Sequence, residues 1–175
     1  MAQPRLAPAS SYNATLNVAD EKPRHMKIGI NFRNWGPHAK RSNLLECARI
    51  ADESTLDSIW VNDHIGFPPD DWHNEYGISE DMGNILDPYA VMAFLGAATS
   101  RIHFGSAVII GSYRPPLPTA KWLQSIQVLS EERMLFGVGP GYLTEEFTAL
   151  GVPKNKRGKL TDELLDILHQ AFTEP

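Results

Sequence analysis

The feature that most constrains the fold is an alternation of strand and helix signals that starts at Met26. Short apolar segments typical of strands begin near residues 26, 58, 102 and 134, roughly 36 residues apart. A segment with the spacing of an amphipathic helix follows each of them, and the last one carries Leu160, Leu164, Leu168 and Phe172. This order predicts parallel strands joined by right-handed crossover helices.

The expected strands are 26–32, 58–62, 101–110 and 134–138. We expect Ser42 to cap the first helix, because a serine hydroxyl can accept a hydrogen bond from a free amide of the first turn. The second helix, 88–99, is expected to begin at Pro88, a position where proline is tolerated. The third is expected over 117–129, and a longer loop runs from Asp63 to Asp87.

Two architectures fit this order, the doubly wound open sheet and the eight-stranded barrel. A barrel of eight such units needs about 250 residues, whereas this chain has 175 and supplies four units. We therefore expect an α/β fold, a TIM-type (β/α)8 barrel truncated to about its first four β/α units. Functional residues of such barrels follow the carboxyl ends of the strands. That rule selects the segments 32–40, 63–87, 108–116 and 139–146.

The composition narrows the class of partner. The net charge is −5, with 16 basic against 21 acidic side chains and no basic stripe, so we expect no nucleic acid. No stretch reaches about 18 consecutive apolar residues, so we expect no membrane span. Cys47 is the only cysteine; we expect it to pack on an apolar helix face, and this usage suits the cytoplasm. Residues 1–25, rich in Pro, Ala and Ser, predict a disordered tail before one domain, 26–175.

Three segments at the strand ends can carry chemistry. Asp63-His64 places a carboxylate beside an imidazole, which suits proton transfer, although a loop cap beside an exposed histidine fits as well. Gly137-Val-Gly-Pro-Gly lacks the spacing of a dinucleotide or phosphate loop, so it is either a backbone cradle for a ligand or a tight turn. The small residues of 105–111 leave room for a flat ring or pack the barrel interior. The acids around His73 match no established ligand spacing, so we expect no metal.

Together these segments resemble the luciferase-like oxidoreductase family over nearly all of 26–175. The runs that carry the resemblance occur in one order: Asp57-Ser-Ile-Trp-Val-Asn-Asp-His, Phe104-Gly-Ser-Ala-Val, Tyr113-Arg-Pro-Pro, Phe136-Gly-Val-Gly-Pro-Gly-Tyr and Ala149-Leu-Gly-Val-Pro. Each run is short, but the collinear set is specific for the family.

The chain is most similar to the branch of the family that uses the deazaflavin coenzyme F420. This similarity rests on the long loop with Pro68 and on the run that begins Glu145-Glu-Phe and leads to Arg157-Gly158. It implies hydride transfer to or from a small organic substrate. The alternative is an FMN-dependent monooxygenase, which oxygenates its substrate through a flavin peroxide. In both cases the cofactor supplies the chemistry and the barrel positions it.

The resemblance also implies roles for single residues. His64 would donate or accept a proton beside the cofactor ring, and Asp63 would contact the polar edge of the ring. Relatives often have a non-proline cis peptide where Ala107-Val108 stands, which would back the ring. Further cofactor contacts fall on Ile110, Pro140, Gly141, Tyr142 and Thr144, with Glu145 beside the last of them.

The sequence departs from the family's pattern at several positions. Glu131-Glu132 replaces a usual pair of glycines before the fourth strand, Thr55 replaces a glycine before the second, and Gln127 replaces an acidic residue. Some deazaflavin enzymes carry a glutamate as proton acceptor near the position of Tyr142. We therefore assign that role to no residue.

The length of the chain bears on its partners. Relatives hold the cofactor phosphate mainly through loops after strands five to eight, so a truncated, non-catalytic half-barrel is the competing hypothesis. Four parallel strands leave two unpaired edges, which favours association. We expect a homodimer, through the helices 88–99 and 117–129 that relatives use, or association with another half-barrel.

Overall fold

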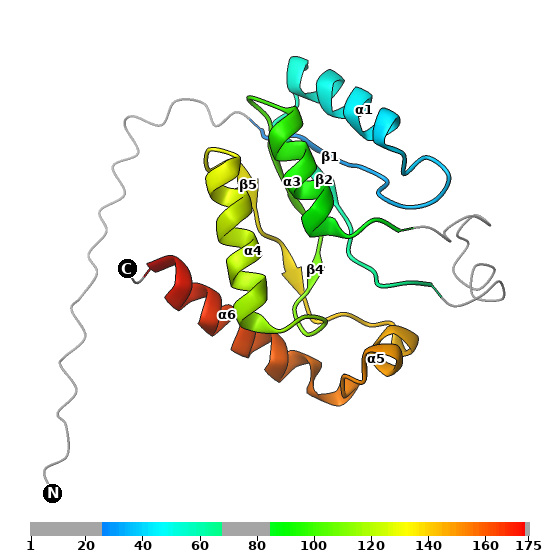
Figure 1. Cartoon of the computed structure of the whole chain (residues 1–175), viewed down its shortest axis with the longest axis vertical. Helices are drawn as coiled ribbons and strands as arrows, with labels where there is room; N and C mark the ends of the chain where they lie inside the picture. Colours follow the sequence, from blue (N-terminus) through cyan, green and yellow to red (C-terminus); the bar gives the residue numbers. More distant parts are fainter. Residues whose placement is uncertain (1–25, 68–84, 174–175) are drawn as a thin grey trace, which may run out of the picture.

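The computed structural model describes residues 26–67 and 85–173. One parallel sheet has the strand order β1-β2-β3-β5 (Figure 1). Its strands are β1 (Gly29–Asn31), β2 (Ser58–Val61), β3 (His103–Ser106) and β5 (Met134–Leu135). Two shorter strands, β4 (Ile109–Ile110) and β6 (Val138–Gly139), pair in parallel beyond β3 and β5. The fold is the predicted one, a partial barrel of the TIM type.

The helices that connect the strands cover one face of the sheet; they are α1 (Arg41–Glu53), α3 (Pro88–Ala98) and α4 (Pro116–Leu129). After β6 follow α5 (Thr144–Leu150), the 3-10 turn η2 (Lys154–Lys156) and α6 (Arg157–Thr173), which packs against α4. Helices α1 and α3 contact β2, α3 also contacts β3, and α4 packs between α3 and α6 (Figure 1).

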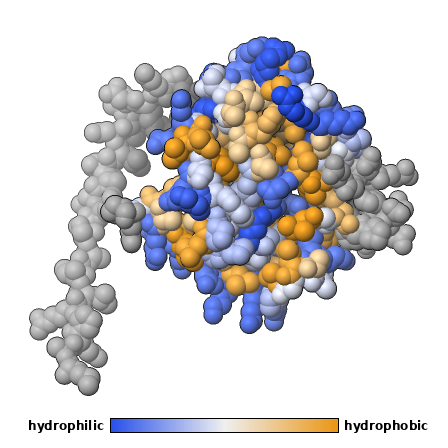
Figure 2. Space-filling model, in the orientation of Figure 1, coloured by the Kyte–Doolittle hydropathy of each residue, from blue (hydrophilic) through white to orange (hydrophobic). Residues whose placement is uncertain are grey.

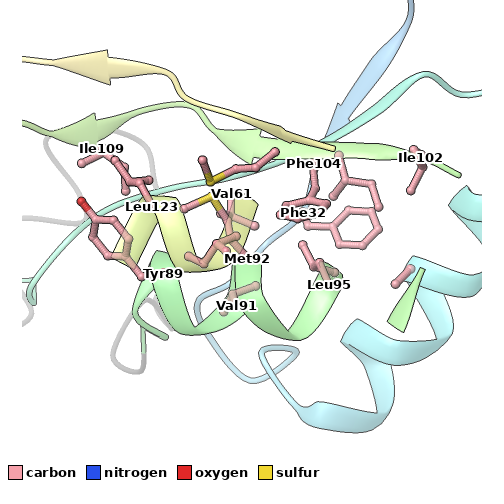
Figure 3. Packing of buried hydrophobic residues seen from close by; sticks show 14 of the residues in the cluster. Phe32, Val61, Tyr89, Val91, Met92, Leu95, Ile102, Phe104, Ile109 and Leu123 are labelled. Carbon is pink, nitrogen blue, oxygen red and sulfur yellow. The ribbon is translucent and has the colours of Figure 1, made fainter. Parts of the chain in front are cut away.

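The main core lies between this sheet and these helices (Figure 3). Val61 and Phe104 from the strands meet Met92 and Leu95 of α3, and all four are fully buried. Full burial of each such side chain stabilises the fold by about 1.5–3 kcal/mol. This packing fixes the strands, and so it fixes where their carboxyl ends lie.

The third and fourth predicted strands are each split in two. The predicted strand 101–110 is interrupted between β3 and β4 by Ala107-Val108, whose peptide bond is cis, as the resemblance implied. The predicted strand 134–138 is interrupted between β5 and β6. The backbone N–H of Ile109 donates to the carbonyl oxygen of Gly137, so both interruptions lie at the same level. The prediction of two continuous strands was therefore wrong near their carboxyl ends, where each strand is interrupted.

Several helix details also differ from expectation. Ser42 does not cap α1, because the helix begins at Arg41, after Lys40, and the Ser42 hydroxyl donates to Asn43 instead. Cys47 is exposed, so the expected packing was wrong. Helix α3 does begin at Pro88, and the Asp87 carboxylate caps it by accepting from two amides of its first turn. Helix α5 was not predicted.

A turn in the left-handed region follows α4. Glu131 and Glu132 have φ values of 53° and 62°, a conformation that residues with a Cβ adopt at a cost of roughly 1–2 kcal/mol each. Glycine avoids this cost, which gives a physical reason for the glycine pair that the family's pattern has at this place.

Some expectations concern other parts of the chain. The predicted tail, 1–25, and His73 with its neighbouring acids lie outside the described residues. Within 26–67 and 85–173, no helix has both the length and the apolar character needed to cross a membrane.

Candidate active site

Two buried carboxylates lie where the carboxyl ends of β2, β4 and β6 meet. Asp63 and His64 follow β2, Arg114 follows β4, and Glu146 lies in α5 after β6. Parallel strands place their carboxyl ends at one edge, so residues up to 82 positions apart in the sequence come into contact. These contacts form two clusters, one around each carboxylate.

The first cluster, the Asp63 cluster, is a closed ion pair. Arg114 donates to both oxygens of Asp63, from Nη1 to Oδ2 at 2.7 Å and from Nη2 to Oδ1 at 2.9 Å. The backbone N–H of Ile110 in β4 donates to Oδ2 at 2.9 Å. The Asp63 side chain is fully buried. It therefore joins the end of β2 to β4 and to the residues after β4.

Arg114 extends the Asp63 cluster to α3. Its Nη2 also donates to Oδ2 of Asp87, the N-cap of α3, at 2.9 Å, and its guanidinium lies 5.0 Å from the centre of the Tyr89 ring. Burial alone would lower the pKa of Arg114, but Asp63 and Asp87 raise it above its ordinary value. Arg114 is thus a permanent cation between two acids, and the cluster carries no titratable partner near neutral pH.

The second cluster, the Glu146 cluster, has a different set of partners. Oε2 of Glu146 accepts the hydroxyl of Tyr113 at 2.6 Å and lies 3.1 Å from Nδ1 of His64. Oε1 accepts the backbone N–H groups of Ile65 at 2.6 Å and Gly66 at 3.2 Å. The Glu146 side chain is 2% exposed and that of His64 is 17% exposed. One carboxylate therefore holds both the imidazole and the backbone that follows it.

The electrostatics of the Glu146 cluster keep its carboxylate ionised. Burial raises the pKa of Glu146, but the hydrogen bonds from His64 and Tyr113, with those from the loop amides, outweigh it, so the pKa lies below its ordinary value. Burial and the neighbouring Glu146 carboxylate raise the pKa of Tyr113 above its ordinary value, so its hydroxyl stays protonated and donates. His64 contributes the imidazole of this cluster, a group that can serve as a proton donor or as a proton acceptor.

The glycines after β5 leave room for neighbouring atoms of the protein. A Cβ on Gly139 would lie 2.9 Å from Cγ2 of Val108, and one on Gly137 would overlap with the backbone carbonyl oxygen of Ser106. A Cβ on Gly141 would lie 2.6 Å from Ile110, and its φ of +76° is left-handed. Of the two hypotheses for this run, the packed turn accounts for all three positions.

An apolar surface accompanies His64 at this end of the sheet. Val108, Ile65 and Tyr142 are all exposed. The Tyr142 ring stands edge-on to the His64 ring, with centroids 6.2 Å apart, and the Phe67 ring lies 4.5 Å from it on a tilted plane. The imidazole thus sits among aromatic and aliphatic side chains, as a proton donor or acceptor beside a flat ligand would need to.

A buried amide pair fixes the backbone below His64. Asn34 donates to the carbonyl oxygens of Asn62 and Leu86 and accepts from the Asn62 backbone N–H. Asn62 donates its side-chain amide to the carbonyl oxygen of Ala107, at the cis peptide. Its own Oδ1 is buried without a hydrogen-bond partner among residues 26–67 and 85–173. A buried acceptor in that state calls for a partner beyond these residues, such as an ordered water molecule or a ligand N–H.

The predicted site residues occupy different surroundings. His64, Asp63, Val108 and Tyr142 lie at the carboxyl ends, as expected. Because both oxygens of Asp63 are taken by Arg114 and Ile110, its contact with a cofactor ring stays a prediction. Ile110 is buried, whereas Pro140 is exposed and Thr144 accepts from Lys154. Their cofactor contacts, with that of Ala107, also stay predictions.

Three residues of the two clusters were given no role from the sequence: Glu146, Arg114 and Tyr113. Glu145 was considered in place of its neighbour, yet Glu145 is exposed and Glu146 is buried. Tyr113-Arg114 comes shortly after the carboxyl end of β4. A basic side chain at that place was a sequence signal for an ion pair with Asp63.

The chain also has relatives. The sequence profile of the family described as luciferase-like monooxygenase matches residues 25–175. A protein of Mycobacterium tuberculosis whose function is uncharacterized is 31% identical over 134 residues, which cover 72% of this chain and 46% of that protein. The chain thus spans a little less than half the length of such relatives.

Two solved structures share the fold. The oxygenating constituent of 3,6-diketocamphane monooxygenase from Pseudomonas putida, in complex with FMN, aligns with a TM-score of 0.67 at 18% identity, over 86% of this chain and 40% of that one. The coenzyme F420 dependent tetrahydromethanopterin reductase of Methanopyrus kandleri aligns with a TM-score of 0.60 at 20% identity, over 82% of this chain and 39% of that one. At these identities the likeness concerns the fold.

Proposed function

The chain belongs to the luciferase-like monooxygenase family, and from that premise we propose that it acts as an oxidoreductase with coenzyme F420. FMN is the alternative cofactor. The observation that carries the proposal is a single imidazole, His64, held by the buried carboxylate of Glu146 at the carboxyl ends of the strands. Barrels of this type carry their active sites at that end.

The surroundings of His64 fit a flat cofactor. Val108 and Ile65 offer exposed aliphatic surface on which a ring can lie, and Asn62 offers an unpartnered acceptor for a ring N–H. When bound, the cofactor would supply hydride transfer to or from a small organic substrate. His64 would supply or remove the accompanying proton, while Tyr142 would cover the ring edge.

One feature of the sequence favours F420 over FMN. The run from Glu145 to Pro153 resembles the F420-using branch, and in this chain it forms α5, which contains Glu146. An F420-dependent reductase is among the proteins that share the fold. An FMN-bound monooxygenase shares it as well, so the choice of cofactor is decided by binding.

Cofactor titration tests the proposal. Oxidised F420 and FMN are each titrated with the chain at micromolar concentration, and quenching of their fluorescence is followed. We expect saturable quenching of F420 with higher affinity than that of FMN, and a His64→Ala chain should retain most of the affinity. Tighter FMN binding would overturn the choice of cofactor. Binding of neither would favour the non-catalytic half-barrel.

We also propose that two copies of the chain associate through α3 and α4. A groove of about 430 Å³ between these helices is lined by Tyr89, Trp122, Ile126 and Leu129, among others. Leu129 and its neighbour Val128 are each 76% exposed, and Figure 2 shows apolar patches on the surface in that view. Large exposed apolar side chains in a groove favour a protein partner.

Light scattering after size exclusion measures this association. We expect a mass of two chains, and we expect Leu129→Lys to shift it toward one, because a charge in the contact is costly to bury. A substitution of the exposed Leu117, outside the groove, by lysine is the matched control. A well-folded monomer of the unaltered chain at tens of micromolar would contradict the proposal.

A further inference from the structure

We propose that Glu146 is the positioning residue of His64: its carboxylate holds the ring proton on Nδ1, so that Nε2 is the atom that exchanges a proton with a bound ligand. The assignment of a reaction to that atom rests on the proposed function. The hydrogen-bond arrangement itself does not, because all its members belong to this chain.

The geometry of Glu146 leaves one arrangement of protons. Ile65 and Gly66 present backbone N–H groups to Oε1, and these groups can only donate. Tyr113 presents its hydroxyl to Oε2 at 2.6 Å. A carboxylate that receives three such donors is an acceptor at every position. Nδ1 of His64, 3.1 Å from Oε2, must then carry a hydrogen and donate it.

Among residues 26–67 and 85–173, His64 has no second ionised partner. Asp63, the residue before it, is neutralised within the pair with Arg114. From the other elements, the rings of Phe67 and Tyr142 face the imidazole. The carboxylate that orients the imidazole is therefore that of Glu146. A neutral His64 with Nδ1 protonated has a lone pair on Nε2, and it becomes an acid at that nitrogen after protonation.

The contacts of Glu146 also fix where Nε2 lies. Oε1 holds the backbone of Ile65 and Gly66, directly after His64, while Oε2 holds the ring. Backbone and side chain are thus tied to one rigid group, itself 2% exposed, in α5. Holding a proton-transfer group within a narrow range of positions is what pre-organises it for reaction.

Replacement of Glu146 by glutamine should change which ring nitrogen of His64 carries the proton. Glutamine has the same shape, but only one of its two terminal atoms accepts hydrogen bonds. The two backbone N–H groups cannot reverse their direction, so they should retain the amide oxygen, and the amide NH₂ should then face Tyr113 and His64. An NH₂ group donates, so Nδ1 would have to accept, and the ring proton would move to Nε2.

Nitrogen-15 NMR of the histidine rings, in the full chain without cofactor, tests the proposal. Spectra are recorded at about pH 9, above the ordinary titration range of histidine, and His64 is assigned as the signal absent from the His64→Gln chain. We expect the Nδ1-protonated tautomer in the unaltered chain and in Tyr113→Phe, which keeps the carboxylate, and the Nε2-protonated tautomer in Glu146→Gln. The exposed His103 is the internal control and should not change.

The outcomes separate this inference from the proposed function. An Nε2-protonated His64 in the unaltered chain would overturn the inference even if Glu146→Gln failed to fold. An unchanged tautomer in a folded Glu146→Gln chain would overturn it too. The expected switch, together with no binding of F420 or FMN, would support the positioning role and refute the proposed function.

Discussion

Asp63 and Glu146 are both buried acids at the same end of the sheet, but their carboxylates are stabilised in different ways. Asp63 faces a guanidinium in a bidentate pair and is enclosed on all sides. Glu146 faces a phenol, an imidazole and two backbone amides. The Asp63 cluster is an ion pair between a carboxylate and a guanidinium, whereas the Glu146 cluster contains an imidazole, His64. The difference assigns the first carboxylate to the fold and the second to chemistry.

The two clusters also hold different parts of the loop after β2. Glu146 holds its beginning, at Ile65 and Gly66, whereas Arg114 holds its end, at Asp87. Asp63 connects Arg114 back to the strand. Because both ends of the loop are fixed by charged groups, Arg114 after β4 and Glu146 in α5, the position of His64 depends on parts of the chain that are distant in sequence.

The largest expected effect is the loss of stability when the Asp63 pair is broken. Asp63→Asn leaves the buried Arg114 with one partially exposed acid, and removal of one member of a buried pair costs about 3–5 kcal/mol. Asp87→Asn is the matched control, because asparagine caps a helix as well as aspartate does. The ion pair that it removes is half exposed, so we expect the unfolding free energy to fall by less than about 1 kcal/mol. Urea unfolding followed by tryptophan fluorescence measures both. Equal effects of the two substitutions would refute the assignment of Asp63 to the fold.

A smaller loss of stability is expected when low pH protonates Glu146. Its pKa is lowered in the folded state, so the stability that its ionised form contributes is present above its ordinary pKa of about 4.3. That stability is lost as the pH falls through the lowered folded-state value. The unaltered chain should exceed Glu146→Gln in unfolding free energy by about 1–3 kcal/mol at pH 5. Urea unfolding at several pH values should show this difference shrinking toward pH 3; a difference that stays constant over that range would argue against an ionised, hydrogen-bonded Glu146.

The sequence predicted the fold class and the position of Asp63-His64 at the end of a strand, since both depend on local patterns. Strand and helix periodicity located the elements, and the Asp63-His64 pair directly after a strand marked the candidate site. The pairings could not be predicted in the same way. Asp63 and Arg114 are 51 positions apart, and His64 and Glu146 are 82 apart, so their contacts depend on how the fold aligns the ends of β2, β4 and β6.

The sequence predictions of local structure were wrong where tertiary contacts outweigh the local propensity of the residues. Ser42 was a reasonable cap, but α1 starts two residues earlier than such a cap implies, after Lys40, and its first turn has no side-chain cap. The predicted strand 101–110 ignored the interruption at Ala107-Val108, where Asn62 from β2's end binds the Ala107 carbonyl. The Glu131-Glu132 pair shows the reverse case. The departure from a glycine pattern was visible in the sequence, and the structure explains the pattern by two positive φ values.

We propose that a cofactor binds beside Nε2 of His64 while Glu146 holds Nδ1. The most direct test is the nitrogen-15 spectrum of His64 in the unaltered chain, recorded with and without saturating F420 at a concentration where fluorescence shows binding. We predict that the Nε2 resonance shifts, that the proton stays on Nδ1, and that His103 is unaffected. A chain that binds F420 with no change at His64, or with the ring proton moved to Nε2, would contradict the claim.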